Sequence, residues 1–255
     1  MLASERRDKL LEVIRLRGFS ALPDLAAELA VSESTIRRDL DQLEEEGSAK
    51  RTHGGVFYSG PSPKLQHFDQ IQAKNFSKKQ QIAQHAVKFI EDGDTVLLDG
   101  GSTTYELARL LVGRTLQVVT NSLPVANLFM GRETADLVII GGYVHVRTGV
   151  SMGPFANEML KDLNCRRAFL SVAAIHEDGL FNSNLLLVET ERAMMKAADE
   201  VIILADSTKF GRKSLSRLCG LEEAQTIVVD NEISEDWRSR VIAAGVNLQV
   251  ADRPK

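Results

Sequence analysis

A short run of glycines and hydroxyl side chains follows an apolar, β-rich segment. Residues 96–98 are typical of a buried strand, and residues 104–111 have the pattern of an amphipathic helix. Glycines allow a tight turn with exposed N–H groups, the start of a helix carries partial positive charge, and hydroxyls add hydrogen bonds. The run therefore predicts an anion site with phosphate as the usual occupant, although a plain capped turn would use similar residues. Its members are Asp99, Gly100, Gly101, Ser102, Thr103 and Thr104.

Further polar turns follow strand-like segments in the same way. Because ligands of open α/β sheets bind beyond the carboxyl ends of the strands, these turns could converge on one crevice. Lys209 could meet a phosphate or sugar oxygen, and Glu189 could accept hydrogen bonds from sugar hydroxyls. A solvated loop lysine and a carboxylate at a helix N-terminus are the plainer interpretations. These additional effector-binding candidates are Thr120, Asn121, Ser122, Gly141, Gly142, Glu189, Asp206 and Lys209.

A second set of residues, near the start of the chain, has the types that contact DNA. Helices are expected over residues 4–17, 23–29 and 33–46, and the last two are joined by the short turn of residues 30–32. This spacing is typical of a helix-turn-helix, whose second helix places its N-terminal side chains in the major groove. A basic run and a glycine turn then predict a β-hairpin wing that contacts phosphates. The predicted DNA contacts are Ser34, Thr35, Arg37, Arg38, Lys50, Arg51, Thr52 and His53.

The charge balance does not by itself indicate nucleic-acid binding. The whole chain has a net charge of −4, and residues 1–57 contain nine Lys and Arg against eleven Asp and Glu. An arginine pair on a helix is often only a solvated face. The basic residues gather at the start of the third helix and in the wing, whereas Glu44, Glu45 and Glu46 lie at its far end. DNA binding would therefore depend on local polarity rather than on net charge.

Several other classes of protein are disfavoured. The start of the chain has no apolar signal segment, and no apolar run reaches the length of a membrane helix. Cys165 and Cys219 match no redox or zinc spacing, and the five histidines show no metal-ligand pattern, so no metal or cofactor is expected. We expect a cytoplasmic protein that is not an enzyme, because no nucleophile–base arrangement stands out and residues 171–174 offer no carboxylate base. An α/β domain that serves only for assembly remains an alternative.

The 255 residues are enough for two domains. Residues 1–57 predict a winged helix-turn-helix, and the Pro- and Gly-containing stretch from 58 to 74 predicts a linker. From 75 to 255, short β-rich runs alternate with amphipathic helical segments. This alternation indicates a mostly parallel α/β sheet covered by helices on both faces.

The run of residues 29–55, with VSESTIRRDL and RTHGG within it, closely resembles the DeoR family of bacterial transcription regulators, and so do GDTVLLDGGSTTYELA and ADEVIILADSTKFG. The resemblance covers nearly the whole chain. It implies a repressor of a carbohydrate operon that binds double-stranded operator DNA as a homo-oligomer. A phosphorylated sugar would release it from an effector domain similar to ribose-5-phosphate isomerase. By resemblance, residues 101–104 would hold the phosphate, with Asn121, Glu189 and Lys209 as further contacts.

This sequence departs from the family pattern at two places. Ser171 begins the loop after AFL where the family often has Gly, and an Arg common before the first effector-domain helix is replaced near Ile71. The first departure puts the shape of the pocket beside the sugar in doubt, and the second puts the contacts of the linker in doubt. Neither touches the phosphate turn.

Overall fold

The computed structural model describes residues 3–17, 19–52, 55–58 and 71–252. The chain divides into two compact units, residues 1–64 and 65–255. We name them, after the functions expected from the sequence, the DNA-binding unit and the sensor unit. Most of the predicted linker, residues 59–70, and the wing residue His53 lie outside the described residues. Residues 71–74, which the sequence places in the linker, belong to the sensor unit.

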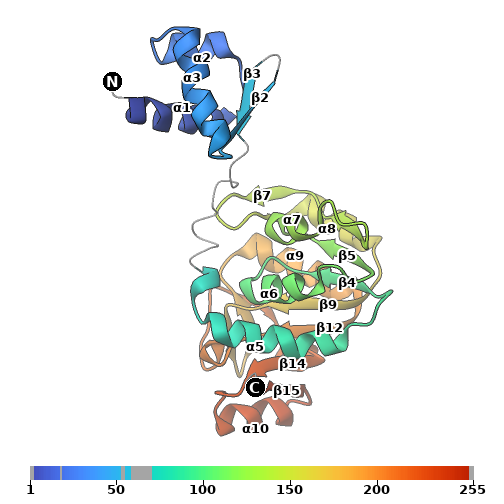
Figure 1. Cartoon of the computed structure of the whole chain (residues 1–255). Helices are drawn as coiled ribbons and strands as arrows, with labels where there is room; N and C mark the ends of the chain where they lie inside the picture. Colours follow the sequence, from blue (N-terminus) through green and yellow to red (C-terminus); the bar gives the residue numbers. More distant parts are fainter. Residues whose placement is uncertain (1–2, 18, 53–54, 59–70, 253–255) are drawn as a thin grey trace. The chain divides into compact units, whose positions relative to one another are not determined.

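The DNA-binding unit contains three helices and a small antiparallel sheet (Figure 1). The strands are ordered β1-β3-β2, and β2 and β3 form the predicted hairpin. The sequence did not reveal β1, a two-residue strand that pairs with β3. The elements are α1 (Ala3–Arg17), β1 (Phe19–Ser20), α2 (Leu22–Glu28), α3 (Glu33–Glu45), β2 (Ala49–Thr52) and β3 (Gly55–Tyr58).

The apolar stripes predicted for these helices meet in one core. Leu10 and Ile14 of α1 and Ile36 and Leu40 of α3 are fully buried together. Ser32 caps α3 as expected, because its Oγ accepts a hydrogen bond from the N–H of Thr35 at 3.3 Å. The turn and the crossing of α2 and α3 therefore present the opposite face of α3 to solvent.

The sensor unit is built on a seven-stranded parallel sheet of order β15-β14-β12-β9-β4-β5-β6. Side chains that alternate along the strands supply two separate cores: Val96 and Leu98 pack on one face, and Leu97 packs on the other. The strands are β4 (Thr95–Leu98), β5 (Leu116–Thr120), β6 (Ala135–Ile139), β9 (Cys165–Ser171), β12 (Ala198–Leu204), β14 (Thr226–Asp230) and β15 (Asn247–Ala251).

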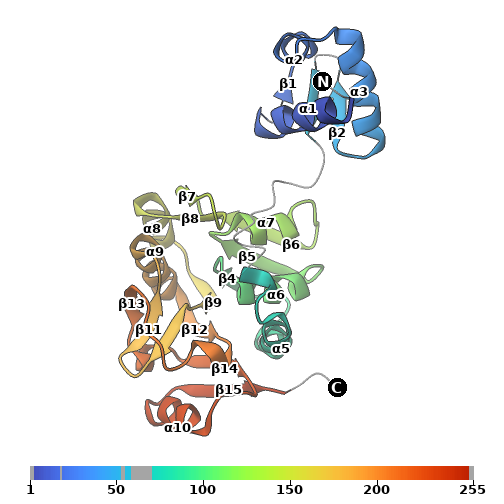
Figure 2. The ribbon, with the colours of Figure 1, turned by 90° about the vertical axis from the view of Figure 1, so that its left-hand side faces the viewer.

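Helices cover both faces of this sheet, which confirms the predicted α/β class (Figures 1 and 2). Helices α5, α6 and α7 contribute to one core, and α8, α9 and α10 contribute to the other. The α-helices are α5 (Phe76–Ala86), α6 (Ser102–Leu111), α7 (Leu123–Phe129), α8 (Pro154–Lys161), α9 (Leu185–Lys196) and α10 (Glu235–Ala243). The short 3-10 helices are η1 (Val87–Phe89), η2 (Ser207–Lys209) and η3 (Leu221–Glu223).

Two small antiparallel sheets flank the large one. The hairpin of β7 (Tyr143–His145) and β8 (Val150–Met152) is one of them. The other contains β10 (Ala174–His176), β11 (Gly179–Asn182) and β13 (Ser216–Cys219). Within the described residues, no helix is long and apolar enough to span a membrane.

Candidate functional site

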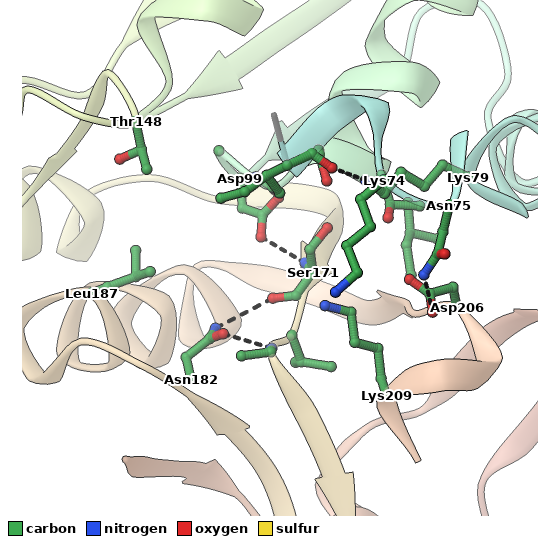
Figure 3. Close-up of a pocket in the computed structure, with 18 of the residues that line it drawn as sticks. Lys74, Asn75, Lys79, Asp99, Thr148, Ser171, Asn182, Leu187, Asp206 and Lys209 are labelled. Atoms are coloured by element: carbon green, nitrogen blue, oxygen red, sulfur yellow. Dashed lines mark hydrogen bonds between the residues drawn. The ribbon is translucent and has the colours of Figure 1, made fainter. Parts of the chain in front are cut away.

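Strands β4 and β9 are neighbours in the sheet. After β4 the chain continues through β5 and β6 to one edge, and after β9 it continues through β12, β14 and β15 to the other edge. The connections therefore leave in opposite directions and open a crevice beyond the carboxyl ends of these two strands, where ligands of such sheets bind. A cavity of about 410 Å³ lies there. The turns after β4, β9 and β12 line it, together with α9 and the residues at the start of α5 (Figure 3).

Asp99 joins the two central strands at the floor of the cavity. Its Oδ1 accepts the N–H of Gly101 at 2.9 Å, and its Oδ2 accepts the N–H of Ser171 at 2.6 Å. The side chain is 2% exposed, and burial raises the pKa of Asp99 to about 6 although these hydrogen bonds act in the opposite direction. The predicted anion turn is thereby fixed to the loop after β9.

Helix α6 begins in the cavity wall without a side-chain cap. Its N-cap residue is Gly101, whose φ of −75° any residue can adopt. Glycine is required here for steric reasons, because a Cβ at position 101 would lie 2.2 Å from Cβ and Oγ of Ser171. The first N–H groups of any helix have no intrahelical acceptor, so those of Ser102 and Thr103 are open to an anion.

A buried carboxylate that the sequence analysis missed also lines the cavity. Glu191 of α9 is 1% exposed, and both its oxygens accept from Nδ2 of Asn182 at 2.7 Å. The amide of Asn182 is oriented by Ala173, whose N–H donates to Oδ1 at 2.7 Å. Burial, together with the charge of Asp99, raises the pKa of Glu191 well above its usual range. This end of the cavity therefore presents a buried carboxyl group to a ligand.

Cationic side chains line another part of the cavity wall. Lys74, Lys79, Lys209 and Arg212 all contribute to it. Burial lowers the pKa of Lys79 to about 8, with Asp206 acting in the opposite direction. The charges of Lys209 and Lys74 also lower the pKa of Lys79. An anion in this part of the cavity would relieve their mutual repulsion.

The structure brings half of the predicted effector residues together. The members of this group that line the cavity are Asp99, Gly100, Gly101, Ser102, Thr103, Asp206 and Lys209. Those that lie outside its wall are Thr104, Thr120, Asn121, Ser122, Gly141, Gly142 and Glu189.

The turn after β5 is closed off by the β7–β8 hairpin. The N–H of Ser151 donates to the backbone oxygen of Asn121 at 2.7 Å, and Nδ2 of Asn121 donates to the backbone oxygen of Ser151 at 2.9 Å. Thr120 donates its hydroxyl to the backbone of Leu98 at 2.7 Å, and Ser122 caps α7. These polar groups are therefore used in holding the fold.

Three other predicted effector residues lie outside the cavity for local reasons. Thr104 is buried, and its hydroxyl bonds to that of Ser171 at 2.9 Å. Glu189 lies on the exposed face of α9, two residues before the buried Glu191. Gly142 is packed against the hairpin backbone: a Cβ there would lie 2.9 Å from the backbone oxygen of Met152.

In the DNA-binding unit, the polar residues of α3 lie on two different faces of the helix, one exposed and one buried. Ser34, Arg37 and Arg38 are exposed and Thr35 is half-buried, whereas Asp39 is buried and forms an ion pair with Arg6 of α1 at 2.6 Å. This ion pair fixes the helix against α1. The exposed residues at the start of α3 are free to contact a surface outside the unit.

Three of the four predicted wing residues, Lys50, Arg51 and Thr52, lie on β2. Lys50 is exposed, and Arg51 forms ion pairs with Asp41 and Glu44 of α3 at 2.6 and 3.1 Å. Thr52 ends the strand, opposite Gly55 of β3. These contacts anchor the hairpin to the far end of α3.

Both units match known domain families. Residues 6–60 match the DeoR-like helix-turn-helix domain, and residues 74–231 match the DeoR C terminal sensor domain. The chain belongs to the DeoR family. It is a DNA-binding transcriptional regulator and not an enzyme, which confirms the sequence-based interpretation.

Relatives in this family match almost end to end. The lactose phosphotransferase system repressor of Lactococcus lactis subsp. lactis is 33% identical over 233 residues, covering 90% of this chain and 91% of the relative. The HTH-type transcriptional regulator GlpR of Haloferax volcanii is 31% identical over 250 residues, covering 97% and 98%.

Among solved structures, ribose 5-phosphate isomerase A of Methanocaldococcus jannaschii is similar to part of the chain. It has a TM-score of 0.38 and 23% identity, and the match covers 52% of this chain and 53% of that one. Family membership therefore rests on the two domain matches and on the relatives.

Proposed function

We propose that this DeoR-family regulator represses a carbohydrate-utilisation operon and leaves its operator when a phosphorylated sugar binds in the cavity of the sensor unit. The observation that carries the proposal is the polarity of this cavity. An uncapped helix N-terminus and a group of lysines can hold a phosphate, and buried carboxylates can hold sugar hydroxyls. The relative named as a lactose phosphotransferase system repressor supports a sugar-linked role.

The phosphate would bind against the first turn of α6. The N–H groups of Ser102 and Thr103, their hydroxyls and the ammonium group of Lys209 would contact it. Asp99 and Asp206 are acceptors, so they would face sugar hydroxyls and not the phosphate. For release to occur, the sugar phosphate must bind the free regulator more tightly than the operator-bound one.

The operator would be read by the start of α3. Ser34, Thr35, Arg37 and Arg38 would reach base edges and phosphates of the major groove, while Lys50, Arg51, Thr52 and His53 of the wing would contact the backbone. The exposure of Arg37 and Arg38 beside the buried Asp39 supports this assignment. A regulator of this kind would act in the cytoplasm, where the operator is.

The regulator would act as a homo-oligomer that pairs through the apolar surface of α8 and α9. These two helices pack on each other. Phe155 of α8 is 82% exposed and Leu185 of α9 is 62% exposed. Met159, about one turn after Phe155, and Leu186, next to Leu185, are also exposed. Apolar groups of this size are costly to leave in water, and a second copy would cover them. Two copies would then present two α3 helices to repeated half-sites.

The test of the effector site is a thermal-shift comparison of the full chain with hexose and pentose phosphates and with their unphosphorylated parents. A ligand that binds only the native state raises the melting temperature. We expect one phosphorylated sugar to stabilise the protein and to release a labelled operator fragment, while its parent sugar does neither. The double variant Ser102→Ala, Thr103→Ala should bind the operator but fail to respond.

If no phosphorylated sugar changed either the melting temperature or operator binding, the proposal would be wrong. That result would favour a sensor unit that serves only for assembly. Normal release of the double variant by the sugar phosphate would instead remove the first turn of α6 from the site.

A further inference from the structure

Residues 71–75, here called the strap, form one wall of the cavity. In the chain they follow residues 59–70 and, before these, the DNA-binding unit. Ile71, Lys74 and Asn75 all line the cavity. The strap is therefore the part of the effector site that lies nearest in sequence to the DNA-binding unit.

Polar contacts from three elements hold the strap in place. Nδ2 of Asn75 donates to Oδ1 of Asp206 at 3.3 Å and to Oγ1 of Thr208 at 3.2 Å. The buried ammonium group of Lys79 donates to the backbone oxygens of Ile71 and Gln72. Nε2 of Gln72 also donates to Oε1 of Glu106 at 2.8 Å. These contacts orient the backbone on both sides of Lys74.

The side chain of Lys74 extends into the cavity, and its ammonium group points towards that of Lys209, which comes from the opposite side (Figure 3). Among the residues that the structure describes, neither ammonium group forms an ion pair with a carboxylate. Oδ1 of the nearby Asp206 accepts hydrogen bonds from Asn75 and Thr208, which position this carboxylate against the strap and η2. Two converging like charges repel each other unless an anion lies between them.

We propose that Lys74 is a ligand-binding residue and that the anionic group of the effector is held between Lys74 and Lys209. The inference rests on the proposed function, because it assigns the same cavity to a phosphorylated ligand. It adds that the bound anion joins the strap to η2 on the opposite wall. Without the anion, repulsion between the two lysines favours separation of the strap from η2. With the anion bound, both lysines contact it, and the strap is held against η2.

The bound anion would thereby act on the part of the sensor unit that follows the DNA-binding unit in the sequence. Lys74 is the cationic residue of the strap, so binding of the phosphate would change how firmly residues 71–75 are held against the cavity. A lysine elsewhere in the sensor unit could increase the affinity for the anion, but binding of the anion to it would not change the position of the strap.

The test titrates inorganic phosphate, at constant ionic strength, into the full-length chain and its variants. Lys74→Gln removes the charge at nearly constant size, Lys209→Gln does the same on the opposite wall, and Lys88→Gln is the matched control at an exposed position outside the cavity. We expect Lys74→Gln and Lys209→Gln each to weaken phosphate binding by about tenfold or more, and Lys88→Gln to change it by less than about twofold. Melting temperatures without phosphate should not fall, because each substitution at Lys74 or Lys209 removes one of the two repelling charges; an equal or slightly higher value shows that the variants fold.

A second measurement follows amide hydrogen exchange in residues 71–75. Phosphate should slow this exchange in the natural protein and leave it unchanged in Lys74→Gln. Binding of phosphate by Lys74→Gln as tightly as by the natural protein would overturn the inference and leave the proposed function standing. If neither phosphate nor any sugar phosphate bound the natural protein, the proposed function would fail, and the inference with it.

Discussion

The close approach of Gly101 to Ser171 leads to a sharp prediction about the effector site. An alanine at position 101 would keep the backbone conformation, since φ is −75°, but its Cβ would lie 2.2 Å from Cβ of Ser171. Ordinary contacts between carbon atoms are about 3.5–4.0 Å, so α6 and the loop after β9 must separate by roughly 1.3–1.8 Å. Crowding of this kind costs about 1–3 kcal/mol of the free energy of unfolding. It also displaces the first turn of α6, and we expect effector affinity to fall at least tenfold.

The matched variants isolate the cause. Ser171→Gly removes the two atoms at 2.2 Å and leaves only Oδ1 of Asp99 at 3.2 Å, whereas Ser171→Ala removes only Oγ and leaves Cβ in place. Combined with Gly101→Ala, Ser171→Gly should therefore restore most of the lost stability and affinity, and Ser171→Ala should not. Ser171→Gly alone should cost about 1 kcal/mol, because its hydroxyl bonds to Thr104.

Urea unfolding of the sensor unit and titration with the effector, or with phosphate as its substitute, measure both quantities. The double-mutant cycle should show a coupling free energy of about 1–3 kcal/mol between positions 101 and 171. Additivity of the two substitutions within about 0.5 kcal/mol would refute the steric reasoning. So would an equal rescue by Ser171→Ala, because the interfering Cβ remains in that variant.

Three further predictions concern separate parts of the molecule. Arg37→Ala should abolish operator binding in a gel-shift assay without lowering the melting temperature, since the side chain is 61% exposed and forms an ion pair with the exposed Glu33; an unchanged operator affinity would exclude it from recognition. The raised pKa of Asp99 means that the folded state holds the proton more tightly, so this group favours folding below pH 4 and loses that contribution as the pH rises through 6. Relative to Asp99→Asn, the natural protein should therefore lose about 2 kcal/mol in its free energy of unfolding between pH 4 and 7, and a relative gain with rising pH would contradict the cause. Phe155→Glu should reduce the oligomer mass measured by sedimentation, and an unchanged mass would place the interface elsewhere.

The sequence predicted the two-part organisation and the classes of element well, because these depend on local patterns. The stripes of Leu10, Ile14, Ile36 and Leu40 follow helical spacing, and the apolar strands of the sensor unit mark a sheet covered on both faces. The fold class is accordingly confirmed. The strand β1 has only two residues, which are too few to show the alternation of apolar and polar side chains by which a strand is predicted.

Which turns meet at the cavity depends on strand order, which no local pattern encodes. The turn after β4 lies at the switch point, whereas the equally polar turn around Asn121 lies one strand away, beneath the β7–β8 hairpin. Glu191 carried a usable signal, since it is charged within the stripe of Val188 and Met194 on α9. Lys74 carried none, because only the tertiary contacts of Asn75 and Lys79 bring it to the cavity.

The ion pairs of Arg51 have a consequence for the way operator affinity depends on salt. Its guanidinium group is already neutralised by Asp41 and Glu44, so a contact with a DNA phosphate would exchange one internal partner for another. The carboxylates of Asp41 and Glu44 would then face the duplex without their partner. They would attract cations from solution, while the DNA phosphate releases its bound counterions. The net release of counterions should therefore be smaller than the number of basic residues at the interface. The slope of log affinity against log salt would depend on residues such as Arg38 and Lys50, which have no carboxylate partner among the described residues. Arg51 would contribute little to this slope.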